Sequence, residues 1–289
     1  MLYGTQLYIY YLGGSQKLWK EGQEAYDNKH YEKARELFEK LALIDSANCA
    51  KYIAGDMYLK GIGGDVDYDR ALTLFLKSAE GGNTFAQNNI GYMYIHGLGV
   101  TQDFGKAYSW LNKAALLGNS EALVGMGSLY KNGWGVSKDY RVAMNWFKRA
   151  AAHGNTDGMN NIGYLYKNGL GVHKNFEEAL FWFKKAESKG NIISQYNIGN
   201  MYCYGEGVER DFSKGAEWLM KAAIQGVDAA QYNLGRMFQF GKGVERNTKK
   251  AEYWFGQAEA SGHVKAKETL IKMKEQTIEE EPNDSLFFF

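Results

Sequence analysis

The chain has 289 residues, with 34 Lys and Arg against 33 Asp and Glu and a formal net charge of +1. This balance argues against general electrostatic binding to nucleic acid or to an anionic membrane surface. No stretch approaches the roughly 20 apolar residues of a membrane-spanning helix. Glycine occurs 35 times but proline only once, which favours helices and structurally fixed glycines over a disordered chain.

The N-terminal part is predicted to consist of a weakly ordered leader, residues 1–14, and a capping helix pair, residues 15–46. No Lys or Arg precedes Lys17, so the basic start of a secretory signal peptide is missing. We therefore expect a cytoplasmic protein, with a periplasmic one as the alternative if a signal peptide is absent from this sequence. In the pair, Trp19, Ala34 and Phe38 follow tetratricopeptide spacing, with a break near Asn28.

Residues 47–262 contain six copies of a 36-residue pattern. Four columns of glycine recur at this period, and the second copy represents them by Gly91, Gly97, Gly99 and Gly118. A fixed internal period of this length is typical of stacked supersecondary units.

The second copy, Thr84 to Asn119, shows why each copy is predicted to form two helices. Apolar residues recur on one helical face at Ala86, Ile90 and Tyr94, and then at Ala107, Trp110, Leu111 and Ala114. Gly97 suits a left-handed cap that ends the first helix near His96. Asp103 is placed to accept free N–H groups at the start of the second helix. Short connections make neighbouring helices antiparallel.

Gly91 lies inside the first helix, where glycine costs about 0.5–1 kcal/mol relative to alanine. Because this cost recurs in every copy, we expect the first helix to pack closely against the small alanine face of a neighbouring second helix. A tryptophan column beside that face comprises Trp110, Trp146, Trp182, Trp218 and Trp254. A lone pair could not bury these side chains, so the copies must stack. The sequence predicts an all-α fold, an α/α solenoid superhelix of stacked antiparallel helix pairs.

The C-terminal part is predicted to be a capping helix, residues 263–276, and a flexible tail, residues 277–289. The tail is acidic, contains Pro282, and ends in three phenylalanines. Charge and proline favour disorder.

The repeated pattern of Ala, Gly, Tyr, Gly-x-Gly-Val, Asp, Ala, Trp and Gly resembles the Sel-one-like repeat family, a branch of the tetratricopeptide-like superfamily, over about residues 47–262. Departures include Leu74 at the tryptophan position, Gly215 where alanine is usual, and Gly158 and Ser194 at the opening alanine. The resemblance implies a non-catalytic adaptor whose concave face, lined by the first helices, holds a partner protein or peptide. Some similar bacterial proteins are immunity proteins that neutralise a toxic effector.

Positions three before and one after the in-helix glycine, and one turn further, are predicted to point toward the concave face. The candidate partner-binding residues are Asn88, Tyr92, Lys131, Asn160, Tyr164, Lys167, Tyr196, Asn200, Tyr232 and Arg236. Tyrosine offers a large contact area at low entropy cost, and asparagine both donates and accepts hydrogen bonds. Asparagine with lysine resembles the carboxylate clamps of peptide-binding tetratricopeptide domains. The alternative is that these side chains only bridge adjacent first helices.

No residue pattern indicates catalysis, a cofactor or a metal. The repeated Gly-x-Gly-Val follows helices and lacks the third glycine of a nucleotide loop, and the histidines have no metal spacing. Cys49 and Cys203 lie four copies apart, too far for a disulfide. We expect a monomer or weak dimer. The alternatives are an immunity protein, a peptidoglycan-type glycan-binding module whose tyrosines stack on sugars, and an enzyme site in the groove.

Overall fold

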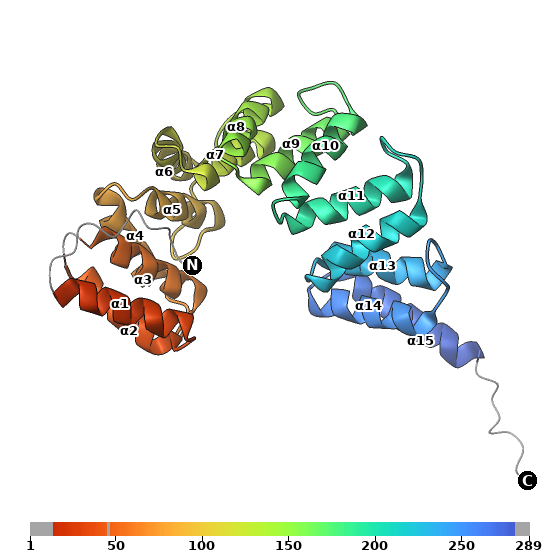
Figure 1. Cartoon of the computed structure of the whole chain (residues 1–289), viewed down its shortest axis with the longest axis horizontal. Coiled ribbons are helices and arrows are strands. Elements are labelled where there is room, and N and C mark those ends of the chain that lie inside the picture. Colours follow the sequence, from red (N-terminus) through yellow and green to blue (C-terminus); the bar gives the residue numbers. More distant parts are fainter. Residues whose placement is uncertain (1–13, 45–46, 281–289) are drawn as a thin grey trace, which may run out of the picture. The chain divides into compact units, whose positions relative to one another are not determined.

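The computed structural model describes residues 14–44 and 47–280, which form fifteen α-helices and no strand (Figure 1). The chain divides into two compact units, Met1–His153 and Gly154–Phe289. The first unit contains α1 (Gly14–Asp27), α2 (Tyr31–Ala42), α3 (Asn48–Lys60), α4 (Tyr68–Glu80), α5 (Thr84–His96), α6 (Phe104–Leu116), α7 (Ser120–Asn132) and α8 (Tyr140–Ala152). The second contains α9 (Thr156–Asn168), α10 (Phe176–Glu187), α11 (Ile192–Tyr204), α12 (Phe212–Ile224), α13 (Asp228–Phe240), α14 (Thr248–Ala260) and α15 (Val264–Glu280).

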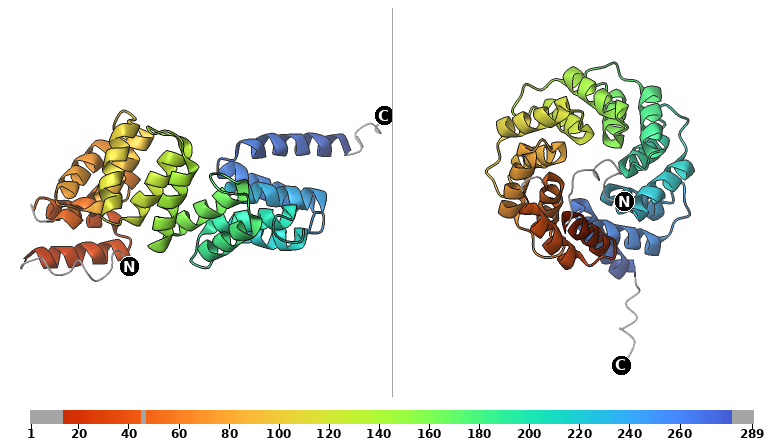
Figure 2. Two further views of the ribbon diagram at one scale, coloured as in Figure 1. Left: turned by 90° about the horizontal axis from the view of Figure 1, so that it is seen from above. Right: turned by 60° about the vertical axis from the view of Figure 1, so that its left-hand side comes forward.

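Within each unit, consecutive helices pack as antiparallel pairs, and each pair packs on the next (Figure 2). An odd-numbered helix is the first helix of a pair and the following even-numbered helix is the second. The all-α solenoid of helix pairs is therefore confirmed. No described helix is both long and apolar enough to cross a membrane.

The ends of the array lie partly outside the described residues. The expected capping pair at residues 15–46 corresponds to α1 and α2, whereas the expected leader lies almost wholly outside. Helix α15 continues to Glu280, past the expected end at residue 276. The rest of the expected tail is outside the described part.

The caps explain the helix boundaries. Gly97 has φ 66° and its N–H donates to the Met93 carbonyl, and Asp103 accepts from the Lys106 N–H, as expected. The asparagine caps of the first helices were not expected from the sequence. Asn191 caps α11 by accepting from the Ser194 N–H, and its amide donates to Thr156 at 3.4 Å in the preceding repeat. One side chain thus both starts a helix and joins two pairs.

The in-helix glycines do permit close packing, but the expected packing partner is wrong. A Cβ at Gly91 would lie 2.6 Å from Leu111, the residue after the tryptophan position. A Cβ at Gly235 would lie 2.8 Å from the Phe255 ring. The glycine therefore makes room for a large buried Leu or Phe side chain, although the alanine carbonyl at Ala107 is also near.

The tryptophans of the second helices lie outside this contact, and all but one are half-buried. A cation three residues later covers the ring in four of them: Lys113 over Trp110, Arg149 over Trp146, Lys185 over Trp182 and Lys221 over Trp218, at 4.0–4.8 Å. This spacing places the two side chains on one helical face, where a cation over an indole is favourable.

Replacing Gly235 by alanine should lower the free energy of unfolding by about 1–3 kcal/mol, the usual cost of overpacking a core. The reason is the Phe255 ring, which has 0% exposure and no room to move away. Chemical unfolding followed by circular dichroism measures the effect.

The matched control is Gly256→Ala, one residue beyond Phe255. Nothing lies within 4 Å of a Cβ there, so the variant should gain about 0.5–1 kcal/mol from its better helix propensity. Equal responses of the two variants would contradict the packing account.

Candidate partner-binding face

All ten predicted residues lie on first helices, and the two units divide them into two sets. The first unit holds Asn88 and Tyr92 on α5 and Lys131 on α7. The second holds Asn160, Tyr164 and Lys167 on α9, Tyr196 and Asn200 on α11, and Tyr232 and Arg236 on α13. We call these ten residues the candidate face.

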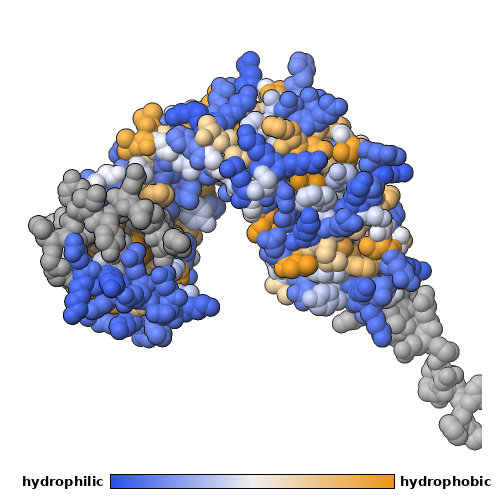
Figure 3. Space-filling view, in the orientation of Figure 1, coloured by the Kyte–Doolittle hydropathy of each residue, from blue (hydrophilic) through white to orange (hydrophobic). Residues whose placement is uncertain are grey.

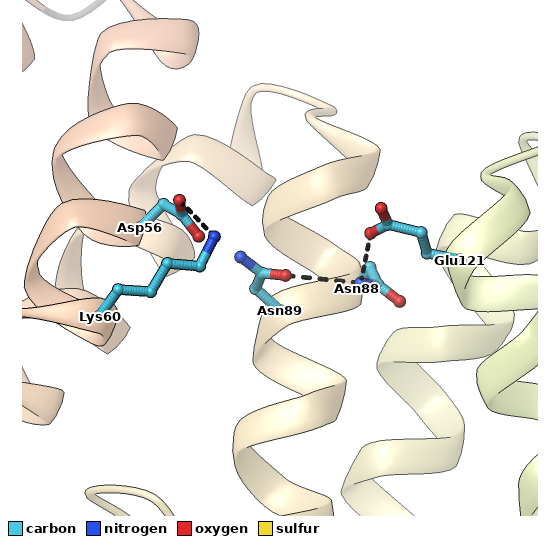
Figure 4. A network of polar contacts seen from close by, with 5 residues as sticks. All are labelled: Asp56, Lys60, Asn88, Asn89 and Glu121. Atoms are coloured by element: carbon cyan, nitrogen blue, oxygen red, sulfur yellow. Dashed lines mark hydrogen bonds and ion pairs between the residues drawn. The ribbon is translucent and has the colours of Figure 1, made fainter. Parts of the chain in front are cut away.

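In the first unit, polar side chains connect neighbouring first helices (Figure 4). The amide of Asn88 on α5 donates to Glu121 on α7 at 3.2 Å and also contacts the Asn89 oxygen at 3.4 Å. On α3, Lys60 donates to Asp56 at 2.8 Å. Figure 4 shows Asn89 between Asn88 and the Asp56–Lys60 pair. Asn88 therefore acts as a bridge between repeats.

Tyr92 and Lys131 differ in how much of each side chain is exposed to solvent. Tyr92 is 46% exposed, and its ring lies 4.3 Å from that of His96. Lys131 is half-buried, with its ammonium 5.9 Å from the Phe147 ring. Burial lowers the pKa of Lys131, because a low-dielectric environment disfavours the charged form. Tyr92 is thus the more accessible contact residue of the two.

In the second unit, hydrogen bonds join α9, α11 and α13 in sequence. Asn160 accepts from Ser194 at 3.0 Å and from Asn197 at 2.9 Å. Asn200 accepts from Asn233 at 3.1 Å. These five residues form a polar ladder across the first helices.

The other members of the second set also contact neighbouring elements. Tyr232 lies within hydrogen-bond distance of Thr269 on α15, at 3.4 Å, and its ring stacks 4.3 Å from His263. Lys167 forms an ion pair with Glu206 at 3.0 Å, with the two side chains 19% and 24% exposed. The Lys167 ammonium, which a carboxylate clamp would offer to a partner, is therefore already paired with the carboxylate of Glu206.

Three residues of the candidate face remain markedly open to solvent. They are Tyr92, Tyr164, which is 43% exposed, and Arg236, whose guanidinium lies 5.8 Å from the Phe240 ring. Tyr196 is half-buried and packs against the apolar core of the second unit. The contacts observed for Asn88, Asn160, Asn200 and Tyr232 thus bridge neighbouring helices of this chain. Contact with a partner stays a prediction for all ten residues of the candidate face.

Two sources of these contacts were not expected from the sequence. One is the asparagine column two positions before the in-helix glycine, which includes Asn197 and Asn233. Its 36-residue period was visible in the sequence. The other is Ser194, regarded only as a departure from alanine, which is fully buried and bonded to Asn160 and Asn191.

The described residues contain no group of three His, Cys, Asp or Glu side chains placed to hold a metal ion. Cys49 and Cys203 are half-buried free thiols. Burial raises the pKa of both thiols, which keeps them protonated and less nucleophilic.

Replacing Asn160 by alanine should lower the free energy of unfolding by about 1–2 kcal/mol, because two neutral hydrogen bonds at about 1 kcal/mol each are lost. Asn145→Ala is the matched control, since Asn145 is exposed inside α8. Urea unfolding measures both variants. A stability for Asn160→Ala equal to that of the control would show that the ladder does not stabilise the stacking.

Comparison with solved structures shows the same architecture elsewhere. The chain is 30% identical to the protective antigen c5321 of uropathogenic Escherichia coli, which displays an SLR fold, with a TM-score of 0.66 over 89% of this chain and 56% of that one. It is 29% identical to a Sel1 repeat protein from Oxalobacter formigenes, with a TM-score of 0.72 over 83% and 96% of the two chains. The immunity protein Pa5087 from Pseudomonas aeruginosa is 22% identical, with a TM-score of 0.57 over 75% and 83%. The chain thus spans little more than half the length of the first of these proteins.

No curated protein matches the sequence. The Sel1 repeat, in contrast, matches seven segments: residues 3–45, 50–83, 84–119, 120–155, 156–191, 192–227 and 228–263. The first segment overlaps the pair expected as a tetratricopeptide-like cap, and the other six coincide closely with the copies derived from the glycine columns. The 36-residue period, the helix pairs and these matches agree, and the chain belongs to the Sel1 repeat family.

Proposed function

We propose that the chain is a non-catalytic scaffold that holds a partner protein or peptide on its candidate face. Sel1 repeats generally mediate protein–protein interaction. The observation that supports the proposal most directly is the pair Tyr92 and Tyr164, which are 46% and 43% exposed on first helices at corresponding repeat positions.

The surroundings of these tyrosines suit recognition. The bonds of Asn88 to Glu121 and of Asn160 to Ser194 hold neighbouring first helices together. A rigid scaffold loses little conformational entropy when a partner binds, and tyrosine adds a large amphipathic contact area at low entropy cost. The bridging asparagines therefore contribute to binding indirectly, by holding the helices that present the exposed side chains.

A glycan-binding module is the second candidate, because exposed tyrosine rings also suit stacking on sugars. An immunity role stays a further alternative. Immunity proteins Pa5087 and PA5088 of Pseudomonas aeruginosa share the fold at 22% and 20% identity, a likeness that carries the architecture alone. The cytoplasmic location and the monomeric or weakly dimeric state stay predictions as well.

Replacing Tyr92, Tyr164 and Arg236 together by alanine should weaken binding of a natural partner at least about thirtyfold, since an anchor residue contributes about 2 kcal/mol or more. These residues lie outside the polar ladder, so the variant should keep its circular dichroism spectrum. Affinity capture from extracts of the source cells, followed by mass spectrometry and titration of the captured protein, measures the loss.

The matched control replaces Phe181, Tyr253 and Lys249, which are exposed on second helices. The parent and the control should retain the same proteins, and the candidate-face variant should lose them. Retention of every protein by all three would contradict binding at the candidate face. Saturable binding to purified peptidoglycan, with no protein retained, would favour the glycan-binding alternative instead.

A further inference from the structure

A cavity of about 230 Å³ opens in the second unit between α11, α12 and α13. Its lining combines an apolar wall with two cations: Cys203, Phe212, Leu219 and Met237 with Arg236 and Lys242. An apolar cavity of about 150 Å³ admits benzene, so this one can receive an aromatic or branched aliphatic side chain. Hydrophobic and hydrophilic side chains are interspersed on the surface over these helices (Figure 3).

Comparison between copies explains why Phe212 borders a cavity. In the first unit, Trp134 stacks on Phe104 with ring centroids 5.7 Å apart and planes 9° apart. Three copies later, Lys242 takes the position of Trp134, and its ammonium lies 5.8 Å from the Phe212 ring. A lysine side chain covers less of a ring than an indole does, so part of Phe212 remains accessible.

A second departure from the repeat lies beside Cys203, which lines the same cavity. Gly215 stands where the other five copies have alanine. A Cβ at Gly215 would overlap the Cys203 sulfur, so the thiol occupies space that alanine closes elsewhere. Larger side chains occupy the position of Cys203 in all five other copies: Leu59, Ile95, Lys131, Lys167 and Gln239. The Cys203 thiol therefore fills the space of the missing methyl group at Gly215, and this small side chain leaves more room at the cavity it lines than those of the other copies would.

The charged side chains that line the cavity are all positive. Arg236 and Lys242 line it, and no Asp or Glu does. Both cations are exposed, and neither forms an ion pair with another described residue. Tyr204 and Phe240 also line the cavity and are 70% and 56% exposed. Cations beside accessible rings favour a ligand that combines a carboxylate with an apolar group.

We propose that this cavity binds an acidic peptide segment of the partner, in which an aromatic or branched aliphatic side chain stands next to Asp or Glu. The apolar side chain enters against Phe212 and Met237, and the carboxylate reaches Arg236 and Lys242. This inference rests on the proposed binding function and specifies the partner's chemistry at one place.

The test uses a pool of capped short peptides randomised at every position and passed over the immobilised full-length protein. Mass spectrometry of the retained peptides should show enrichment of an aromatic or branched aliphatic residue next to Asp or Glu. Lys242→Leu should abolish this enrichment, because the variant removes one of the two cations that the carboxylate would reach. The variant should fold, since Leu98 and Leu170 occupy the corresponding positions of other copies. Lys249→Leu, on exposed α14 surface outside the cavity, should keep the enrichment.

Two further measurements locate the peptide. A selected peptide should bind Arg236→Gln about tenfold more weakly, the effect of losing about 1.4 kcal/mol of charge-assisted bonding. In a Cys49→Ser background, that peptide should slow alkylation of the Cys203 thiol. Lys249→Leu should bind the peptide as tightly as the parent does and should keep the protection of Cys203, whereas Lys242→Leu should lose that protection.

Retained peptides without the acidic and apolar combination, or an enrichment that survives Lys242→Leu, would overturn this inference. Those outcomes leave the proposed function standing if extract proteins still depend on Tyr92 and Tyr164. Conversely, extract capture that is indifferent to the candidate face would overturn the proposed function, whatever the peptides show.

Discussion

Each helix pair of the six glycine-column copies depends on one contact, between a glycine inside its first helix and a large apolar side chain on its second. The rings of Phe183 and Phe255 have 0% exposure where they meet Gly163 and Gly235. Burying such a side chain stabilises the fold by about 1.5–3 kcal/mol, which exceeds the roughly 0.5–1 kcal/mol that a helical glycine costs. The close approach lets both helices form a compact unit that can stack on the next.

Stacking adds a polar component that the pairs alone do not have. Asn119 and Asn191 each cap a first helix and reach a threonine of the preceding repeat at 3.4 Å. The ladder from Asn160 to Asn233 continues these contacts along the first helices of the second unit. Because hydrogen bonds require defined geometry, these side chains set the register of neighbouring pairs and keep the exposed tyrosines in place.

Two residues near the cavity depart from the repeated pattern. Lys242 and Gly215 break columns that are apolar and alanine in most other copies. Each change leaves the helix pair intact. Lys242 lines the cavity between α11, α12 and α13, and Gly215 makes room for the Cys203 thiol, which also lines it. In a repeat protein such departures are informative, because every other copy shows which side chain the packing alone would favour.

Features that depend on local chemistry could be predicted from the residues of one copy. The 36-residue period, the helix ends at Gly97 and Asp103, and the all-α solenoid follow from caps and apolar faces that lie within one copy. Successive residues on a helix point about 100° apart, so the sequence placed the glycine contact on the second helix but expected its small alanine face where the large Leu111 side chain lies.

The hydrogen-bond partners of the polar residues on the candidate face became apparent only from the packing of the helix pairs. Asn160 bonds Asn197, and Asn88 bonds Glu121, 37 and 33 positions away in the chain. Such contacts depend on how one pair is rotated and shifted against the next, which no pattern within a copy specifies. The cavity has the same origin, because Cys203, Phe212 and Lys242 come together only when three helices pack.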